Sequence, residues 1–177
     1  IVPSDPFELF KVLQEAVNYK NSLYIRLTAG TNTRIINSKD YKFKIGKAIE
    51  IMSGDDVAII GCGNILGNCI DAALSLKKKK ISCSVINMHT IKPIDKKKII
   101  EISKKFKLII TVEEHNIIGG LGSAVAEVLS GEISSTKLVR LGAEDYYSSG
   151  GSYEYLKNTY GLSVKKIIST ILKNHEK

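Results

Sequence analysis

The residues best suited to do chemistry follow a short apolar run near residue 110. Residues 108–112 are apolar or β-branched, and Glu113, Glu114 and His115 come directly after them. This pattern is typical of a buried strand that ends in polar residues, and carboxylates beside a histidine can form an acid/base group. The alternative is that these residues terminate the strand and contact a neighbouring domain or subunit. We identify no nucleophile or metal partner in the sequence, so we favour the second interpretation.

A glycine-rich turn that contains Gly119 and Gly120 separates these polar residues from a predicted helix at about 121–129. Free backbone N–H groups at the start of a helix favour anions. In open α/β sheets, ligands and partners lie at the carboxyl ends of the strands. The turn and the three polar residues before it are therefore a candidate anion loop or interface.

A second glycine-rich turn, with Gly61 and Gly63, lies between a predicted strand at 57–60 and a predicted helix at about 66–78. Its position is that of a phosphate-binding loop. Its spacing departs from the dinucleotide-binding fingerprint, because Leu66 stands where the third glycine is required. We therefore favour a plain tight turn over a bound cofactor, and keep both glycines as candidates for an anion loop or interface.

Arg26 lies in a predicted short strand at 23–27. An arginine at the end of a strand can hold a phosphate or carboxylate through two parallel hydrogen bonds. A structural salt bridge explains the residue equally well. His89 follows another predicted strand at 83–88 and could approach His115 in space.

The order of the elements predicts the fold class. Strands at 57–60, 83–88, 108–112 and 137–141 alternate with helices at about 66–78, 95–105 and 121–129, and helical stretches at 153–157 and 163–172 follow. This alternation predicts a three-layer αβα domain with a mostly parallel sheet. Upstream, the pattern predicts a helix at 6–19, a linker at 28–44, and a hairpin-like pair formed by 46–52 and 57–60.

Composition excludes several classes of partner. The net charge is +8, but nearly all the excess is lysine spread over helix-like segments. Aromatic residues do not interleave with the densest run at 77–80, so we expect neither a nucleic acid nor a membrane partner. The three cysteines are odd in number and form no CxxC pair, which fits reduced thiols in the cytoplasm and no metal site. The sequence begins with Ile1 rather than Met, so we expect it to come from a longer or processed polypeptide.

Several motifs, taken in order, resemble the transketolase family. VINMHTIKPID at 85–95 and TVEEHNIIGGLGSAVAEVL at 111–129 look like its carboxyl-terminal domain, as do FKIGKA at 43–48, LGAEDYYSSGG at 141–151 and NTYGLSVKKII at 158–168. IVPSDPFEL at 1–9 and YIRL at 24–27 resemble the end of its pyrimidine-binding domain. The resemblance implies that 1–40 is the tail of that second α/β domain and a linker, and that 41–177 is the carboxyl-terminal domain.

The resemblance also implies a function. Transketolases use thiamine diphosphate and a divalent metal, usually Mg²⁺, to transfer a two-carbon ketol unit between sugar phosphates. Cofactor and metal lie between the diphosphate- and pyrimidine-binding domains at a dimer interface. We therefore expect this chain to need those upstream or separate domains as partners, to form a homodimer, and to be inactive alone. Arg26 occupies the position of the arginine that contacts the substrate phosphate.

Two alternatives remain open at the level of sequence. Within the enzyme class, the motifs are shared with deoxyxylulose phosphate synthases and with β subunits of 2-oxo acid dehydrogenases. The synthases show YPRG, whereas in this chain Arg26 continues as Leu27-Thr28-Ala29-Gly30. The β subunits usually have arginine where His89 stands. Outside the enzyme class, the chain could be a non-catalytic regulatory module that binds a small anion or a partner.

Overall fold

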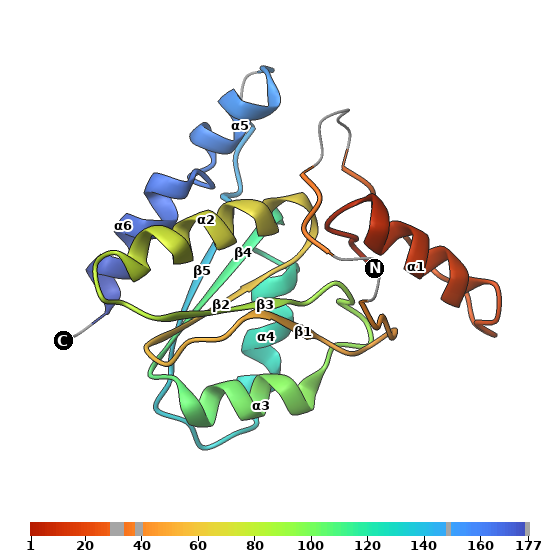
Figure 1. Ribbon diagram of the computed structural model, residues 1–177, viewed down its shortest axis with the longest axis horizontal. Helices are drawn as coiled ribbons and strands as arrows, with labels where there is room; N and C mark the ends of the chain where they lie inside the picture. The colour runs from red at the N-terminus through yellow and green to blue at the C-terminus, as the bar shows by residue number, and fades with distance from the viewer. Residues whose placement is uncertain (29–33, 38–40, 148–149, 176–177) are drawn as a thin grey trace.

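A computed structural model describes residues 1–28, 34–37, 41–147 and 150–175. Its centre is a five-stranded sheet with the order β1-β3-β2-β4-β5 (Figure 1). The strands are β1 (Ile49–Met52), β2 (Val57–Gly61), β3 (Cys83–Asn87), β4 (Leu108–Asn116) and β5 (Lys137–Ala143). Neighbouring strands among β2, β3, β4 and β5 pair in parallel, and β1 pairs antiparallel to β3. The predicted mostly parallel sheet is confirmed.

Helices cover both faces of the sheet and make the predicted three layers (Figure 1). One face carries α2 (Leu66–Lys77), which follows the short 3-10 helix η1 (Gly63–Ile65), and α6 (Val164–Asn174), which comes after α5 (Tyr153–Thr159). The other face carries α3 (Lys96–Lys105) and α4 (Leu121–Ser130). The αβα prediction is therefore confirmed.

Alternation along the central strands explains why there are two apolar cores. Successive side chains of a strand point to opposite faces. Accordingly, Ile59 and Ile110 pack in the core beneath α2 and α6, whereas Ile60 and Ile109 pack in the core beneath α3 and α4. Strands buried on both faces are apolar throughout, which is the pattern that β2 and the first part of β4 show.

The structure corrects three predicted elements. The hairpin-like pair is wrong, because β3 lies between β1 and β2 and takes the hydrogen bonds that a hairpin would have used. The strand predicted at 108–112 continues to Asn116, so Glu113, Glu114 and His115 belong to β4. The strand predicted at 23–27 is an extended segment outside the sheet, tied to Ile1 by the main-chain hydrogen bond from the nitrogen of Arg26.

The amino-terminal segment lies at one end of the sheet and carries α1 (Pro6–Ala16) (Figure 1). Asp5 caps this helix through a 2.7 Å hydrogen bond from the nitrogen of Glu8. The buried carboxylate of Glu8 in turn accepts hydrogen bonds from Tyr41 and, at 2.8 Å, from Asn87 at the end of β3. These contacts fasten the segment to the sheet. Of the linker predicted at 28–44, residues 29–33 and 38–40 lie outside the described residues.

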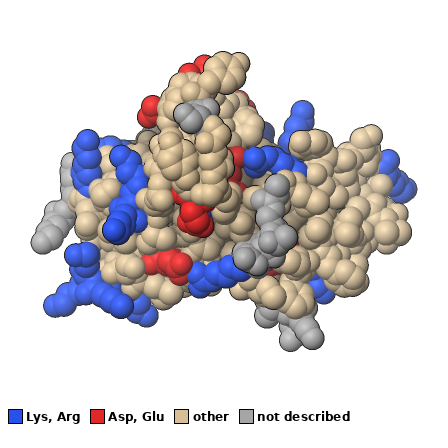
Figure 2. Space-filling model, turned by 90° about the horizontal axis from the view of Figure 1, so that it is seen from above, with Lys and Arg blue, Asp and Glu red and all other residues tan. Residues whose placement is uncertain are grey.

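The surface carries the lysine excess in a dispersed form. On the face seen in Figure 2, Lys and Arg side chains lie in several separate groups, with Asp and Glu between some of them. Within the described ranges, no helix is long and apolar enough to cross a membrane.

Candidate functional site

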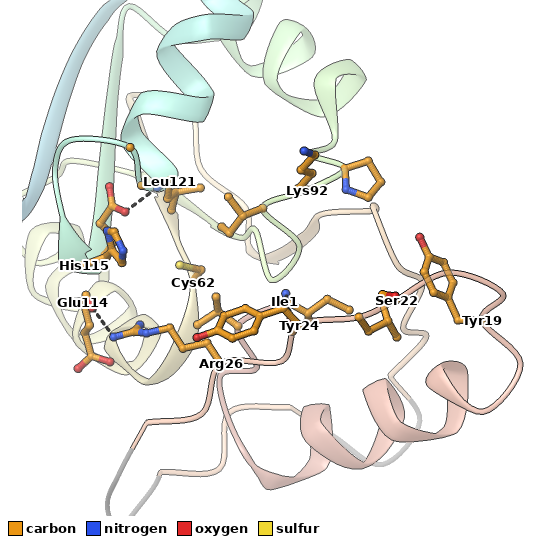
Figure 3. Close-up of a pocket in the computed structure, with 17 residues that line it drawn as sticks. Ile1, Tyr19, Ser22, Tyr24, Arg26, Cys62, Lys92, Glu114, His115 and Leu121 are labelled. Atoms are coloured by element: carbon orange, nitrogen blue, oxygen red, sulfur yellow. Dashed lines mark hydrogen bonds between the residues drawn. The ribbon is translucent and has the colours of Figure 1, made fainter.

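A cavity of about 610 Å³ lies between the amino-terminal segment and the carboxyl ends of β2 and β4 (Figure 3). Most of the candidate residues identified from the sequence line this cavity. Its lining includes Arg26, Glu113, Glu114, His115, Gly119 and Gly120. Residues almost a hundred positions apart in the chain are thus brought to one site. This site lies at the carboxyl ends of parallel strands, which is where ligands bind in open α/β sheets.

Arg26 enters this cavity from the extended segment and is held by a neutral partner. Its Nη2 donates a 2.7 Å hydrogen bond to the main-chain oxygen of Glu114 (Figure 3). Among the described residues, Arg26 takes part in no ion pair. A carbonyl orients the guanidinium without neutralising it, so the positive charge stays available to an anion in the cavity.

Two further groups that can carry positive charge line the same cavity. Lys92 belongs to the loop after β3 and is exposed, and no carboxylate among the described residues forms an ion pair with it. His115 is also exposed, with Nδ1 3.0 Å from the main-chain oxygen of Asn116. Lys92 could have been singled out from the sequence, since it lies in the stretch VINMHTIKPID at 85–95.

Glu113 has a structural task at this site. Its carboxylate accepts hydrogen bonds from the main-chain nitrogens of Leu121, at 2.5 Å, and Gly122, at 2.8 Å. Burial raises the pKa of Glu113, and these two hydrogen bonds oppose that rise. The first turn of α4 therefore already holds a carboxylate from within the chain. An external anion would have to displace Glu113 to use those nitrogens.

Gly120 is required by this arrangement. A Cβ at Gly120 would lie 1.9 Å from Oε2 of Glu113, so a side chain there would expel the carboxylate. Arg140 of β5 braces the same turn from outside, because its Nη1 donates a 3.0 Å hydrogen bond to the main-chain oxygen of Ile117. Gly119 is exposed and has a positive φ of 78°, which glycine adopts without strain.

The Glu114 side chain ties three segments together, and its hydrogen-bond partners differ from those of Glu113. One carboxylate oxygen accepts a hydrogen bond from Tyr153 of α5, and the other accepts one from Thr28 at 3.3 Å. Tyr153 also accepts a 3.1 Å hydrogen bond from Nδ2 of Asn64. Sequence reasoning missed Tyr153, because nothing local in the chain indicates that α5 returns to the end of β4.

The structure leaves Gly61, Gly63 and His89 outside the cavity lining. Gly63 has a positive φ of 72°, and a Cβ there would lie 2.9 Å from Cγ1 of Val2, so the amino-terminal segment covers this turn. His89 is fully buried and packs against Phe43, with ring centroids 4.4 Å apart and the ring planes tilted by 37°. Cys62 does line the cavity, and burial raises the pKa of its thiol to about 12.

No group of three or more His, Cys, Asp or Glu residues within the described ranges is arranged to hold a metal ion. The cavity thus combines one fixed arginine, a lysine and a histidine with two carboxylates that are engaged elsewhere. Such a set suits the binding of an anionic group by charge-assisted hydrogen bonds.

Comparison with known proteins places the chain in a family. Residues 46–167 match the model of the transketolase C-terminal domain. A protein described as a putative transketolase C-terminal section from Methanocaldococcus jannaschii is 37% identical over an alignment that covers 100% of this chain and 55% of that protein. One of the subunits of apulose-4-phosphate transketolase from Actinobacillus succinogenes is 33% identical, with 96% of this chain and 55% of that relative covered.

One further relative and a solved structure agree with this match. 1-Deoxy-D-xylulose-5-phosphate synthase from Caldanaerobacter subterraneus subsp. tengcongensis is 33% identical, and the alignment covers 98% of this chain and 28% of the synthase. A solved structure described as a split-gene transketolase, inactive beta4 tetramer, has a TM-score of 0.89 and 31% identity over 97% of this chain and 55% of that chain. The chain spans about half the length of the transketolase C-terminal section, of the apulose-4-phosphate transketolase subunit and of the split-gene transketolase chain. It belongs to the transketolase C-terminal domain family.

Proposed function

We propose that this chain is the carboxyl-terminal part of a transketolase-like enzyme that transfers a two-carbon ketol unit between sugar phosphates. The names of two relatives, a transketolase C-terminal section and one of the subunits of a transketolase, support this proposal. The observation that carries it is the Arg26 guanidinium, which lines the cavity while bound only to the neutral Glu114 carbonyl among its described partners. Arg26 is thereby suited to hold the phosphate of a sugar-phosphate substrate.

The proposal divides the chain into two parts. Residues 1–40 form the end of the pyrimidine-binding domain and the linker, and 41–177 form the carboxyl-terminal domain. The family match, which begins at residue 46, supports this boundary. The alignment with the transketolase C-terminal section covers the whole of this chain, which supports the assignment of 1–40 to the same enzyme.

The cofactor belongs to the rest of the enzyme in this proposal. Thiamine diphosphate and Mg²⁺ would bind to upstream or separate domains, since the described residues offer no metal-binding cluster. The chain would act only with those domains, as a homodimer in the cytoplasm. The cofactor supplies the carbanion chemistry of ketol transfer, and the part proposed for this chain is to bind and orient the phosphate end of the substrate.

The test is the Arg26→Ala variant in the complete enzyme. Loss of one charge-assisted contact worth about 2 kcal/mol should raise KM for a sugar phosphate about thirtyfold and leave kcat nearly unchanged. Arg34→Ala is a matched control, because Arg34 pairs with Asp71 on an exposed surface away from the cavity. An unchanged KM for Arg26→Ala would remove Arg26 from the substrate site and overturn the proposal for this cavity.

A further inference from the structure

The end of β4 contains a local irregularity at the residue that holds Arg26. Val112 pairs with Leu141 and Asn116 pairs with Ala143, so the three residues 113–115 lie opposite the single residue Gly142. A bulge of this kind leaves main-chain groups of the longer strand without a ladder partner, and bulges re-aim groups beside active sites. Here the main-chain oxygen of Glu114 accepts its hydrogen bond from Arg26 instead.

The bulge depends on the absence of a side chain on the neighbouring strand. A Cβ at Gly142 would lie 2.8 Å from the main-chain oxygen of His115 and 2.9 Å from Cγ2 of Ile117. Any larger residue on β5 at this point would push the bulge outward. The position of the Glu114 carbonyl is therefore fixed partly by the backbone of β5.

The side chain of Glu114 fixes the same residue from the opposite side. Tyr153 donates to its carboxylate and is itself held by Asn64, in η1 after β2. Burial and the hydrogen bond to Glu114 raise the pKa of Tyr153, so its phenol keeps its proton and remains a donor at neutral pH. Thr28 donates to the second carboxylate oxygen at 3.3 Å, two residues beyond Arg26. One glutamate thus links β4, α5 and the segment that carries the arginine.

We propose that Glu114 and Tyr153 are positioning residues for Arg26, so that the carboxyl-terminal domain sets the orientation of the guanidinium that binds the substrate phosphate. This inference rests on the proposed function and extends it. It gives the domain a role in substrate recognition through a neutral carbonyl, which orients the arginine without competing for its charge. Hydrogen bonds weaken steeply as their geometry departs from the optimum, so a displaced guanidinium should bind the phosphate less tightly.

The test uses the complete enzyme and compares a phosphorylated acceptor sugar with the unphosphorylated sugar of the same chain length. Glu114→Ala and Tyr153→Phe should each raise KM for the phosphorylated acceptor about five- to tenfold, with kcat within about twofold, because only the phosphate contact is disturbed. KM for the unphosphorylated acceptor should stay the same. Glu114→Gln keeps an oxygen acceptor for Tyr153 and should restore most of the affinity. Tyr155→Phe, on the exposed side of α5, is the matched control.

A double variant separates positioning from an independent contact. If Glu114 acts through Arg26, then Arg26→Ala with Glu114→Ala should be no worse than Arg26→Ala alone. The inference would be overturned if the increases in KM of the two single variants multiplied in the double variant. It would also be overturned if Glu114→Ala raised KM equally for the phosphorylated and the unphosphorylated acceptor. The ratio of the two KM values does not depend on the fraction of folded enzyme, so partial unfolding cannot mimic the expected result.

The failures of the two proposals can be told apart. If Arg26→Ala itself leaves KM for the phosphorylated acceptor unchanged, the proposed function of the cavity fails. If Arg26→Ala raises that KM while Glu114→Ala and Tyr153→Phe do not, only the positioning role of Glu114 and Tyr153 fails.

Discussion

The Glu113 carboxylate lies 2.5 Å from the main-chain nitrogen of Leu121, the first residue of α4. A side chain at the end of β4 thus caps the helix that follows it. The cap satisfies two main-chain donors that a helix otherwise leaves without partners, and its negative charge suits the positive end of the helix dipole. The structure therefore gives the first of the two adjacent glutamates a role in stability.

Glu113→Gln should destabilise the fold. Whichever way the amide is turned, its NH₂ faces the N–H of Leu121 or that of Gly122, and one buried donor is left unsatisfied. The free energy of unfolding should fall by about 1–3 kcal/mol. Chemical denaturation measures the change, and Glu127→Gln, at an exposed position of α4, is the control. Equal stability of Glu113→Gln and the unmodified chain would contradict the capping role.

Gly142→Ala should also destabilise the chain, because the added methyl group meets the oxygen of His115 at 2.8 Å. A buried steric conflict of this kind costs about 1–3 kcal/mol. Gly131→Ala is a suitable comparison, since the nearest atom to its Cβ would be 3.8 Å away. The two variants are compared by their thermal unfolding midpoints. If Gly142→Ala and Gly131→Ala had the same thermal unfolding midpoint, the bulge would tolerate a side chain at residue 142.

His89 should make stability depend on pH between about 4 and 6.5. Burial lowers the pKa of His89 from 6.5 to about 4. Between pH 6.5 and 4, the imidazole of His89 is protonated in the unfolded chain but not in the folded chain. The free energy of unfolding therefore falls as the pH decreases through this range. His89→Gln should lose less stability over the same range, by on the order of 2–3 kcal/mol.

Denaturation profiles at several pH values would test the role of His89. The account of His89 would fail if His89→Gln showed the same fall in stability between pH 6.5 and 4 as the unmodified chain. Subtracting the two profiles removes the contributions of the other titrating groups.

The sequence was sufficient to predict the elements whose causes are local. Helix α1 was predicted at 6–19 from Pro6 in its first turn, an apolar stripe and a cap at Ser4 or Asp5. The structure shows that Asp5 is the cap and that the helix ends at Ala16. The alternation of apolar strands and helices gives the αβα layers. Both signals lie within windows of ten to twenty residues, which is the range over which periodicity and capping act.

The missed features depend on contacts between distant residues. The placement of β3 between β1 and β2 depends on which strands pair with each other, and no local pattern in 46–60 indicates this pairing. The extension of β4 from Val112 to Asn116 lies opposite Gly142 of β5, where a Cβ would meet the main-chain oxygen of His115. The role of Glu113 depends on burial, which an acidic residue at the end of an apolar run does not reveal.

The candidate site was predicted in outline. Arg26 and the residues of β4 and its following turn do meet at one cavity, whereas the turn at Gly61 and Gly63 does not line it. Tyr153 and Thr28, which complete the surroundings of Glu114, come from segments whose approach only the three-dimensional fold determines.

The most direct test of the central claim is an activity assay on the complete enzyme, in which this chain is present together with the rest of the pyrimidine-binding domain and the diphosphate-binding domain. Thiamine diphosphate and Mg²⁺ are supplied, and ketol transfer between sugar phosphates is followed. We predict that the complete enzyme transfers a ketol unit and that this chain alone does not. Condensation of pyruvate with an aldehyde phosphate in place of ketol transfer would contradict the proposal, as would a folded complete enzyme with neither activity.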